Sequence, residues 1–374
     1  MTFHQKLRLL QGLLTRETAF AGPFAMTVDV TRRCNLQCLG CAFHSPHAAN
    51  KASGEPSPPD LDADLFERLC GELRSMGAGV MVFCGEGEPL LHPRIFEMIR
   101  TAKDAGFRTA ILTNGTLLDE STVRSLLDSG LDRARVSLWA STPEEYEKNY
   151  PGTKPEYFTK VVEGLRLLIS ARELAASRSP RVELHFVVNR YNHRGVDSYV
   201  DLALDAGCDG VSFAPLVTHG GQFADFGLSS EEEEDLKAQL FRAKKKLSSR
   251  GMAHSIDETI QRYGFGPSSR ETTPCYIGWL HCRMKLDGTV RPCNPCDWPV
   301  GNLREQTMRE IWNSPAYRSF RRKSLSQAAN PDLEERCDCR YCCYITEITR
   351  VHRVYRWILP ISNLIEEWRG GKDA

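Results

Sequence analysis

The hydrophobic positions between residues 25 and 215 follow two alternating patterns, short continuous apolar runs and longer stretches with a helical period. Short apolar runs bounded by turn residues are typical of strands that a parallel sheet buries on both faces. The predicted strands are 25–30, 80–83, 109–112, 134–138, 182–188 and 211–214. Helices are predicted between them over 61–76, 95–105, 120–129, 157–175 and 196–205. This alternation predicts an α/β fold with six β/α repeats, too few to close an eight-stranded barrel.

Three further stretches have helical patterns outside these repeats. Residues 1–14 are short and amphipathic, and residues 227–250 are so rich in charge that a solvated face or linker is expected. Residues 345–368 form a basic and then acidic amphipathic pattern broken by Pro360. This last stretch is expected to pack on the main domain, with binding to a membrane surface as the alternative.

Composition excludes several classes of protein. Lys plus Arg and Asp plus Glu both number 48, so the chain lacks the excess of positive charge that nucleic-acid binding requires. No apolar run approaches the roughly 18 residues that span a bilayer. Fourteen cysteines in a chain that does not open on a signal peptide indicate the reducing cytosol, and hence cytoplasmic localisation. A length of 374 residues predicts one large domain plus a smaller one.

Three cysteines lie close together directly after the first predicted strand, at Cys34, Cys38 and Cys41. Close local clusters of cysteine usually bind metal. A structural zinc site wants four protein ligands, and an electron-transfer [4Fe-4S] cluster wants four thiolates. Three thiolates therefore leave one metal position open for another ligand.

The C-x3-C-x2-C loop resembles the signature of radical S-adenosylmethionine enzymes. The resemblance implies an open (β/α)6 partial TIM-like barrel over residues 23–226, with the three cysteines binding a [4Fe-4S] cluster and S-adenosylmethionine chelating its open iron. An electron, here from a flavodoxin- or ferredoxin-like donor, splits the cofactor to a 5'-deoxyadenosyl radical that takes a hydrogen atom from substrate. The family usually has an aromatic residue before the third cysteine. Gly40 stands there in this chain, so Phe43 is the candidate contact for adenine.

The segment C-G-E-G-E-P over residues 84–89 resembles the family's G-G-E-P turn, with Glu86 in place of the first glycine. The resemblance implies that Gly87 and Glu88 receive the amino group of the cofactor, since an ammonium in a low-dielectric cleft needs such acceptors. Glu86 is expected either to tune this site or to face the substrate. The strand ends that follow imply further contacts with the ribose and the carboxylate of the cofactor, at Asn114, Ser137 and Asn189.

Eight of the fourteen cysteines lie in the last hundred residues. Cys275, Gly288 and Cys293 have the spacing that opens twitch and SPASM domains, and Asp287-Gly288 is a hairpin signal. The resemblance implies a small Fe-S domain over 271–344, between a helical linker (227–270) and the C-terminal helix (345–374). Its auxiliary [4Fe-4S] cluster is expected on Cys275, Cys293, Cys339 and Cys342. Zinc is the alternative, and the four remaining cysteines would suffice for a second cluster in a different spacing.

The resemblance implies a radical oxidoreductase or epimerase acting on a small molecule such as a sugar or aminocyclitol. The short segment before the first strand favours a free small molecule over a leader peptide, and a peptide-modifying maturase and a non-catalytic Fe-S or zinc scaffold are the alternatives. A substrate radical can lose an electron to the auxiliary cluster or take a hydrogen atom from a thiol. Cys282 and Cys296, outside the expected cluster set, are the candidate donors, with buried packing or a second cluster as their other roles.

Overall fold

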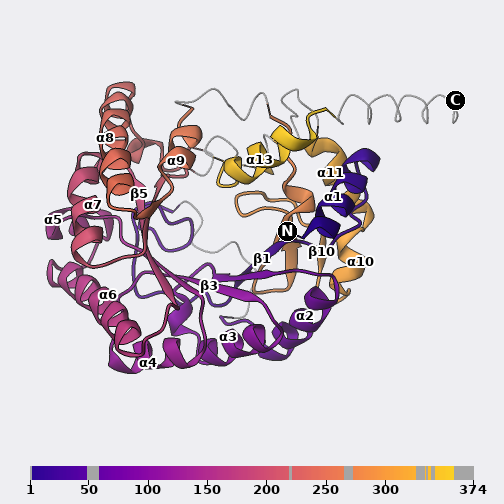
Figure 1. The fold of residues 1–374 in the computed structure, drawn as a ribbon, viewed down its shortest axis with the longest axis horizontal. Helices are drawn as coiled ribbons and strands as arrows, with labels where there is room; N and C mark the ends of the chain where they lie inside the picture. Colours follow the sequence, from indigo (N-terminus) through magenta and orange to yellow (C-terminus); the bar gives the residue numbers. More distant parts are fainter. Residues whose placement is uncertain are drawn as a thin grey trace, which may run out of the picture.

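The computed structural model describes residues 2–48, 59–218, 221–264, 273–325, 333, 336–337 and 342–357. Within them, one curved sheet of ten strands runs through the molecule in the order β10-β9-β8-β1-β2-β3-β4-β5-β6-β7. Figure 1 shows helices along the outer side of this curved sheet. We call the inner side of the sheet the lumen. The fold is therefore the open α/β barrel that the sequence predicts.

The six predicted strands are confirmed as neighbouring parallel strands. Their bounds are β1 (Ala25–Asp29), β2 (Val80–Cys84), β3 (Arg108–Thr113), β4 (Arg133–Ser137), β5 (Arg181–Val188) and β6 (Gly210–Pro215). The helices of this region are α2 (Ala63–Ser75), α3 (Ile95–Asp104), α4 (Glu120–Asp128), α5 (Pro143–Asn149), α6 (Glu156–Leu174) and α7 (Val196–Asp205). Short 3-10 helices lie at η1 (Pro89–Leu91), η2 (His193–Gly195) and η3 (Ala224–Phe226).

Side chains alternate between the two faces of each strand. In β2, β4 and β5 the fully buried positions point toward the helices, and the partly exposed positions point into the lumen. Polar residues such as Ser137 and His185, which are register partners on β4 and β5, thus share the inner face. This alternation decides which residues can reach a bound cofactor or substrate.

The charged stretch predicted as a solvated linker is a barrel helix in the structure. Helix α8 (Ser230–Ser249) buries Leu236, Leu240, Ala243 and Leu247, and its capping box at Ser229 and Glu232 explains the acidic start. After it come β7 (Ala253–His254), which pairs in parallel with β6, and α9 (Ile256–Arg262). The linker prediction missed this buried stripe because the charges on the outer face dominate the composition.

The predicted hairpin around Asp287-Gly288 is confirmed, and its first strand joins the barrel. Strand β8 (His281–Met284) pairs antiparallel with β9 (Thr289–Arg291) and parallel with β1. Gly288 has a φ of 87°, which a residue without a Cβ adopts most easily. The remaining elements are η4 (Ile277–Trp279), β10 (Gly301–Asn302), α10 (Met308–Trp312) and α11 (Pro315–Ser324). The C-terminal region therefore supplies one wall of the lumen.

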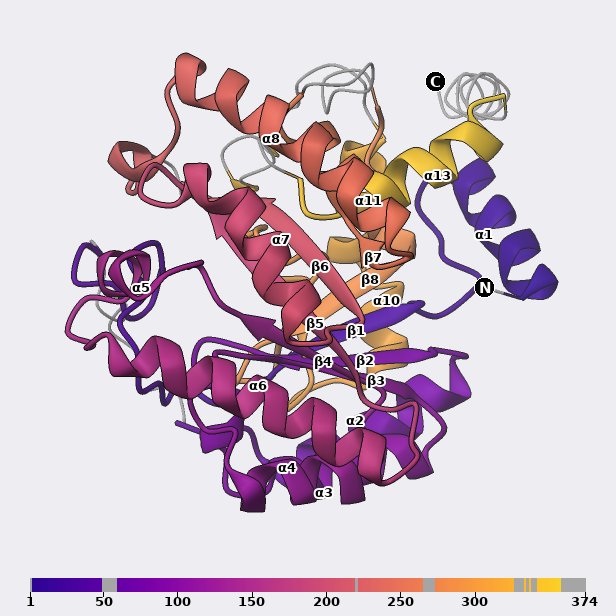
Figure 2. The same cartoon turned by 60° about the vertical axis from the view of Figure 1, so that its left-hand side comes forward.

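The two ends of the described chain lie side by side. Figure 2 shows α1 (Phe3–Thr15) beside α13 (Ile345–Tyr355), and the Tyr355 hydroxyl donates to the Lys6 carbonyl at 3.2 Å. The rest of the predicted C-terminal helix, from residue 358, lies outside the described residues. Among the helices that the structure describes, none is both long and apolar enough to cross a membrane.

Arg321 is a fully buried cation that ties the N-terminal segment to the C-terminal region. Its guanidinium donates to the carbonyls of Gly278, Glu17 and Trp312 and to Asn313 Oδ1, at 2.7 to 3.1 Å. The rings of Trp279, Trp312 and Tyr317 lie 4.4 to 5.7 Å from it. Burial lowers its pKa to about 10.

Replacing Arg321 by Met should destabilise the protein by about 3 kcal/mol or more, because several buried carbonyls lose their donor at once. The matched control is Arg322→Met, since Arg322 is half exposed and pairs only at the surface with Glu17 at 2.6 Å. Its loss should cost at most about 1 kcal/mol. Thermal unfolding of the two variants measures the difference, and equal melting temperatures would contradict the role given to Arg321.

Candidate active site and auxiliary cysteine pocket

The three-cysteine loop leaves the carboxyl end of β1 and packs against the segment after β4. The Leu39 amide donates to the Asn149 carbonyl at 2.9 Å, and the Cys41 amide donates to the Cys38 carbonyl at 3.0 Å. Tyr146 and Tyr150, both almost completely buried, stack behind the loop with ring centroids 4.3 Å apart. Helix α5, which carries Tyr146, thus gives the loop a rigid support that the sequence analysis did not anticipate.

The thiols of this loop suit a cationic cluster. Burial, followed by the charges of Glu88 and Cys41, raises the pKa of Cys34 to about 11, and burial with the neighbouring thiols also raises that of Cys38. A bound metal would relieve this repulsion and displace the protons. Among the described residues, no three His, Cys, Asp or Glu side chains converge on a single ion. The thiolates of a cubane each bind a different iron, so they need not converge in this way.

The turn after β2 lies directly on the cysteine loop. The Glu88 amide donates to the Arg33 carbonyl at 2.8 Å. A Cβ at Gly87 would lie 2.2 Å from the Arg33 carbonyl oxygen, so only glycine fits this approach. The structure therefore brings together two motifs that are about fifty residues apart in the sequence.

The Glu88 carboxylate is buried and held by three donors. It accepts from the Thr113 hydroxyl at 2.7 Å, the Asn114 amide at 2.7 Å and the Leu90 amide at 3.1 Å. Burial nevertheless raises the pKa of Glu88 to about 7, against the lowering effect of these hydrogen bonds. A fixed carboxylate with a poorly solvated charge is well suited to an ammonium group.

Binding of S-adenosylmethionine should therefore strengthen with pH between 6 and 8, as Glu88 becomes charged. The change should approach tenfold per pH unit below a pKa of about 7, because one proton is released on binding. The free energy of unfolding has the opposite pH dependence. The raised pKa of Glu88 contributes stability that is fully present below about pH 4 and is lost as the pH rises through 7. Calorimetric titration under anaerobic conditions measures the affinity at each pH.

Glu88→Gln should weaken this binding by roughly tenfold or more and remove most of the pH dependence, since a charge-assisted hydrogen bond contributes about 1.5 to 3 kcal/mol. Glu97→Gln is the control, because Glu97 is an exposed carboxylate whose partner is Arg94 at 2.7 Å. A flat profile in the unmodified protein would refute the assignment of Glu88.

Three predicted cofactor residues have different surroundings. The Asn114 side chain donates to Asn35 Oδ1 at 2.9 Å and accepts from Thr116, so it fixes the cysteine loop to the end of β3. Ser137 Oγ accepts from the Trp139 indole at 2.8 Å on the lumen side of β4. Asn189 is fully buried and bonded to Asn149 and Tyr191. Its carboxamide holds the segments after β4 and β5 together, which does not favour contact with the cofactor.

The position before the third cysteine has a steric explanation. A Cβ at Gly40 would lie 2.3 Å from Leu216 Cδ1, so the side chain of Leu216, after β6, occupies the space of the usual aromatic residue. Phe43, the predicted substitute, is 37% exposed and its ring lies 5.0 Å from Lys285 Nζ. Phe43 thus lies at the mouth of the lumen beside a charge cluster that sequence analysis missed.

That cluster links β1, the cofactor turn and β8. Arg283 pairs with Asp29, Lys285 pairs with Asp29 and Glu86, and Arg32 pairs with Glu86. Arg283 and Lys285 occupy alternate positions after the start of β8, so both point into the lumen. This alternation was visible in the sequence, but the pairing of β8 with β1 was not.

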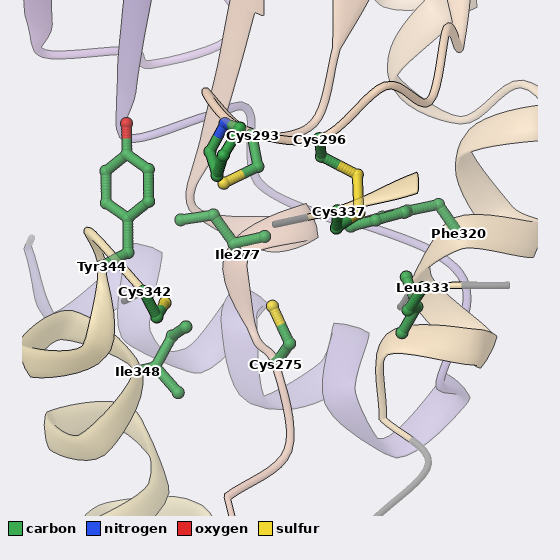
Figure 3. A pocket seen from close by; sticks show the side chains of 11 residues that line it. Cys275, Ile277, Cys293, Cys296, Phe320, Leu333, Cys337, Cys342, Tyr344 and Ile348 are labelled. Atoms are coloured by element: carbon green, nitrogen blue, oxygen red, sulfur yellow. A yellow bond between two sulfur atoms is a disulfide. The ribbon is translucent and has the colours of Figure 1, made fainter. Parts of the chain in front are cut away.

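Several cysteines of the described C-terminal region line one apolar pocket, shown in Figure 3. Among its lining residues are Cys275, Cys293 and Cys342, three of the four predicted cluster ligands. The fourth, Cys339, lies outside the described residues. Cys343 hydrogen-bonds to Cys293, and that bond is the leading cause of the raised pKa of Cys293. The gathered sulfurs and the apolar lining fit an iron-sulfur cluster.

Neither predicted hydrogen donor is placed as a thiol in the lumen. Cys282 is buried on β8, and the side chains on either side of it, His281 and Arg283, bond to the lumen residues Thr27 and Asp29. Cys282 therefore faces the opposite side, toward Tyr317 and Arg321. Cys296 is joined to Cys337 in a disulfide beside the cysteine pocket and carries no S-H bond there.

Tyr344 connects the cysteine pocket to the lumen. Its ring lines the pocket, and its hydroxyl, which points away from the sulfurs in Figure 3, lies 2.8 Å from His281 Nε2. His281 Nε2 also lies 2.9 Å from Thr27 Oγ1, and burial lowers the pKa of His281 to about 3. A neutral imidazole and two hydroxyls therefore separate the two sites.

Comparison with known families agrees with this architecture. Residues 28–172 match the Radical SAM superfamily, and residues 275–343 match SPASM, an iron-sulfur cluster-binding domain. The chain belongs to the radical S-adenosylmethionine enzyme superfamily and has a SPASM-type C-terminal domain. Its cofactors are S-adenosylmethionine, a [4Fe-4S] cluster in the barrel, and auxiliary iron-sulfur cluster content in the SPASM-type domain.

Three relatives show the extent of the likeness. Over 319 residues, 80% of this chain and 85% of the other, it is 27% identical to the AdoMet-dependent heme synthase of Methanosarcina barkeri (strain Fusaro / DSM 804). The structure of Streptococcus suis SuiB bound to S-adenosylmethionine has a TM-score of 0.64 at 15% identity, covering 92% of this chain and 78% of that one. The structure of native anSMEcpe with bound AdoMet and Kp18Cys peptide has a TM-score of 0.62 at 16% identity, covering 91% of this chain and 99% of that one. These two structures establish the fold.

Proposed function

We propose that this protein abstracts a hydrogen atom from a small molecule held in the barrel lumen and that the substrate radical is oxidised. The observation that carries this proposal is the placement of Tyr344, whose ring lines the cysteine pocket while its hydroxyl reaches His281 in the lumen. When bound, the cofactors would supply the 5'-deoxyadenosyl radical on one side of the substrate and an electron acceptor on the other. The enzyme would thus be an oxidoreductase.

The chain's own residues hold and orient the reactants. Glu88 and the carbonyls of the 87–88 turn would receive the ammonium of the cofactor, while Asn114 fixes the cysteine loop through Asn35. Ser137 lies on the inner face of β4, and Leu216 packs against Gly40 of the cysteine loop. Burial of these groups excludes water from a radical that would otherwise be quenched.

A small-molecule substrate is favoured over a peptide. The heme synthase, related across four-fifths of this chain, has a small molecule in its printed name. SuiB and anSMEcpe, for which printed titles include peptides, share only the fold at 16% to 17% identity. A sugar or aminocyclitol was expected from the sequence, but an aminocyclitol is cationic and would be repelled by Arg32, Arg283 and Lys285. Peptide modification is the alternative.

Epimerisation is the second candidate reaction, and Cys84 is the observation that favours it. This thiol ends β2 on its lumen side, and its pKa is raised to about 12 by burial and the nearby Asp29. A protonated thiol can give a hydrogen atom to a substrate radical. Cys84 replaces Cys282 and Cys296 in this role.

Anaerobic incubation with S-adenosylmethionine and dithionite tests the proposal, with 5'-deoxyadenosine as the expected product. If cluster-loaded protein forms no 5'-deoxyadenosine, the proposal is wrong and the non-catalytic scaffold is the supported alternative. Turnover of an identified substrate in deuterated water separates the two reactions. A product two hydrogens lighter, without deuterium at carbon, supports oxidation, whereas deuterium incorporation that is lost in Cys84→Ala establishes epimerisation.

A further inference from the structure

Five charged side chains form an unbroken chain at the mouth of the lumen. Arg283 Nε lies 3.0 and 3.1 Å from the two oxygens of Asp29, and Lys285 Nζ lies 3.6 Å from Asp29 Oδ2. Lys285 also pairs with Glu86 Oε1, while Arg32 approaches Glu86 Oε2 at 2.8 and 2.9 Å. The order is cation, carboxylate, cation, carboxylate, cation, so one positive charge in this set is uncompensated.

The two signs differ in their exposure. The side chains of Asp29 and Glu86 are 0% and 2% exposed, whereas those of Arg283 and Lys285 are each 14% exposed and that of Arg32 is 33% exposed. The carboxylates are buried, and the cations are the exposed members of this set. The exposed part of the set is therefore positive.

This surface adjoins the expected position of the cofactor. Glu86 directly precedes the Gly87-Glu88 turn, and its carbonyl lies 2.8 Å from His44 Nε2. The Phe43 ring lies over Lys285 and supplies an apolar side to the cationic group.

We propose that Lys285 and Arg32 bind a carboxylate of the substrate, with Glu86 as the internal counter-ion of both cations when the substrate is absent. This proposal rests on the proposed function, which places a small molecule in the same lumen. A single carboxylate would neutralise the uncompensated charge, whereas a phosphate dianion would overcompensate it. Glu86, which stands where the family has glycine, is then a specificity-determining residue rather than a ligand of the cofactor.

A purely structural role for the ion pairs makes a different prediction. Ion pairs that served only as a strut between β8 and β1 would contribute little net stability. Loss of a strut would lower the melting temperature without changing the preference for an anion over its neutral analogue. That preference is therefore the quantity to measure.

The probes are 4-benzoylbenzoate and its neutral analogue 4-benzoylbenzamide, photolysed with anaerobic, cluster-loaded full-length protein in the presence of S-adenosylmethionine. Tandem mass spectrometry locates the label. The acid should label peptides containing Phe43 or residues 283–286 saturably, about tenfold more than the amide, because the bound carboxylate makes charge-assisted hydrogen bonds. Equal labelling by acid and amide would overturn the proposal.

Variants of opposite sign sharpen the test. Lys285→Gln should reduce labelling by the acid to the level of the amide, and Lys285→Arg should restore it. Glu86→Gln should increase labelling by the acid several-fold, because it removes the internal counter-ion. Arg242→Gln, at an exposed pair with Asp197, is the control and should match the unmodified protein. Unchanged labelling by the acid in Lys285→Gln, or reduced labelling by the acid in Glu86→Gln, would refute the subsite. If Lys285→Gln does not fold, the labelling of Glu86→Gln decides the question.

Failure of this subsite can be told apart from failure of the proposed function. Formation of 5'-deoxyadenosine by the same unmodified preparation reports the radical chemistry without any substrate. Cofactor cleavage with equal labelling by acid and amide overturns the carboxylate subsite alone. A strong preference for the acid without cofactor cleavage supports the subsite and overturns the proposed radical reaction.

Discussion

Simultaneous replacement of Cys34, Cys38 and Cys41 by Ala is expected to abolish formation of 5'-deoxyadenosine. The other predicted ligands among the described residues line the C-terminal pocket, so they are not placed to replace these three thiolates. Iron content after anaerobic reconstitution should fall from about eight per chain to about four, since each cubane holds four irons. Iron analysis and product chromatography measure both quantities.

The matched control is replacement of Cys70 by Ala. Cys70 is buried on the outer helix α2 and belongs to neither set of cysteines. This variant should keep the iron and the product of the unmodified protein. Residual 5'-deoxyadenosine in the triple variant would contradict the assignment of the loop, and about twelve irons in the unmodified protein would indicate two auxiliary clusters.

Replacement of Gly87 by Ala is expected to weaken S-adenosylmethionine binding by about 100-fold or more. The new Cβ would meet backbone atoms, with the Arg33 oxygen at 2.2 Å and the carbonyl carbons of Arg32 and Arg33 at 2.7 Å. The turn and the cysteine loop would have to separate, which would displace the groups that receive the cofactor. A misplacement of about 1 Å is enough to lower the rate of an enzymatic reaction about 100-fold. Anaerobic calorimetry measures the affinity.

Gly79→Ala is the control for Gly87→Ala. Gly79 directly precedes the same strand, β2, and a Cβ there would have no heavy atom within 4 Å. Its affinity for the cofactor should equal that of the unmodified protein. If both alanine variants bind equally well, the close approach at Gly87 is not required.

The sequence predicted those features that depend on local patterns. The six core strands follow from continuous apolar runs, and the three-cysteine loop from its spacing. The hairpin at Asp287-Gly288 was predictable because a two-residue turn carries its own signal. Such features need no knowledge of what packs against them.

The features that sequence analysis missed depend on contacts between distant segments. The pairing of β8 with β1 joins residues about 250 positions apart, and it alone decides that Arg283 faces the lumen while Cys282 faces the helices. Asn189 was assigned to the cofactor from its place at a strand end, and its hydrogen bond to Asn149, in the preceding repeat, could not be predicted from that place. The buried stripe of α8 was hidden by its exposed charges.

The pairing of β8 with β1 means that the two parts of this chain are not interchangeable modules. A chain that ended before residue 273 would leave one edge of β1 without its neighbour, and an open edge beside the apolar Met26 and Val28 invites pairing with other chains. Transplanting the C-terminal region onto the barrel of another family member would likewise replace the side chains that meet Asp29 and Thr27. Natural divergence of the C-terminal domain is therefore constrained by the first strand of the barrel, far away in the gene.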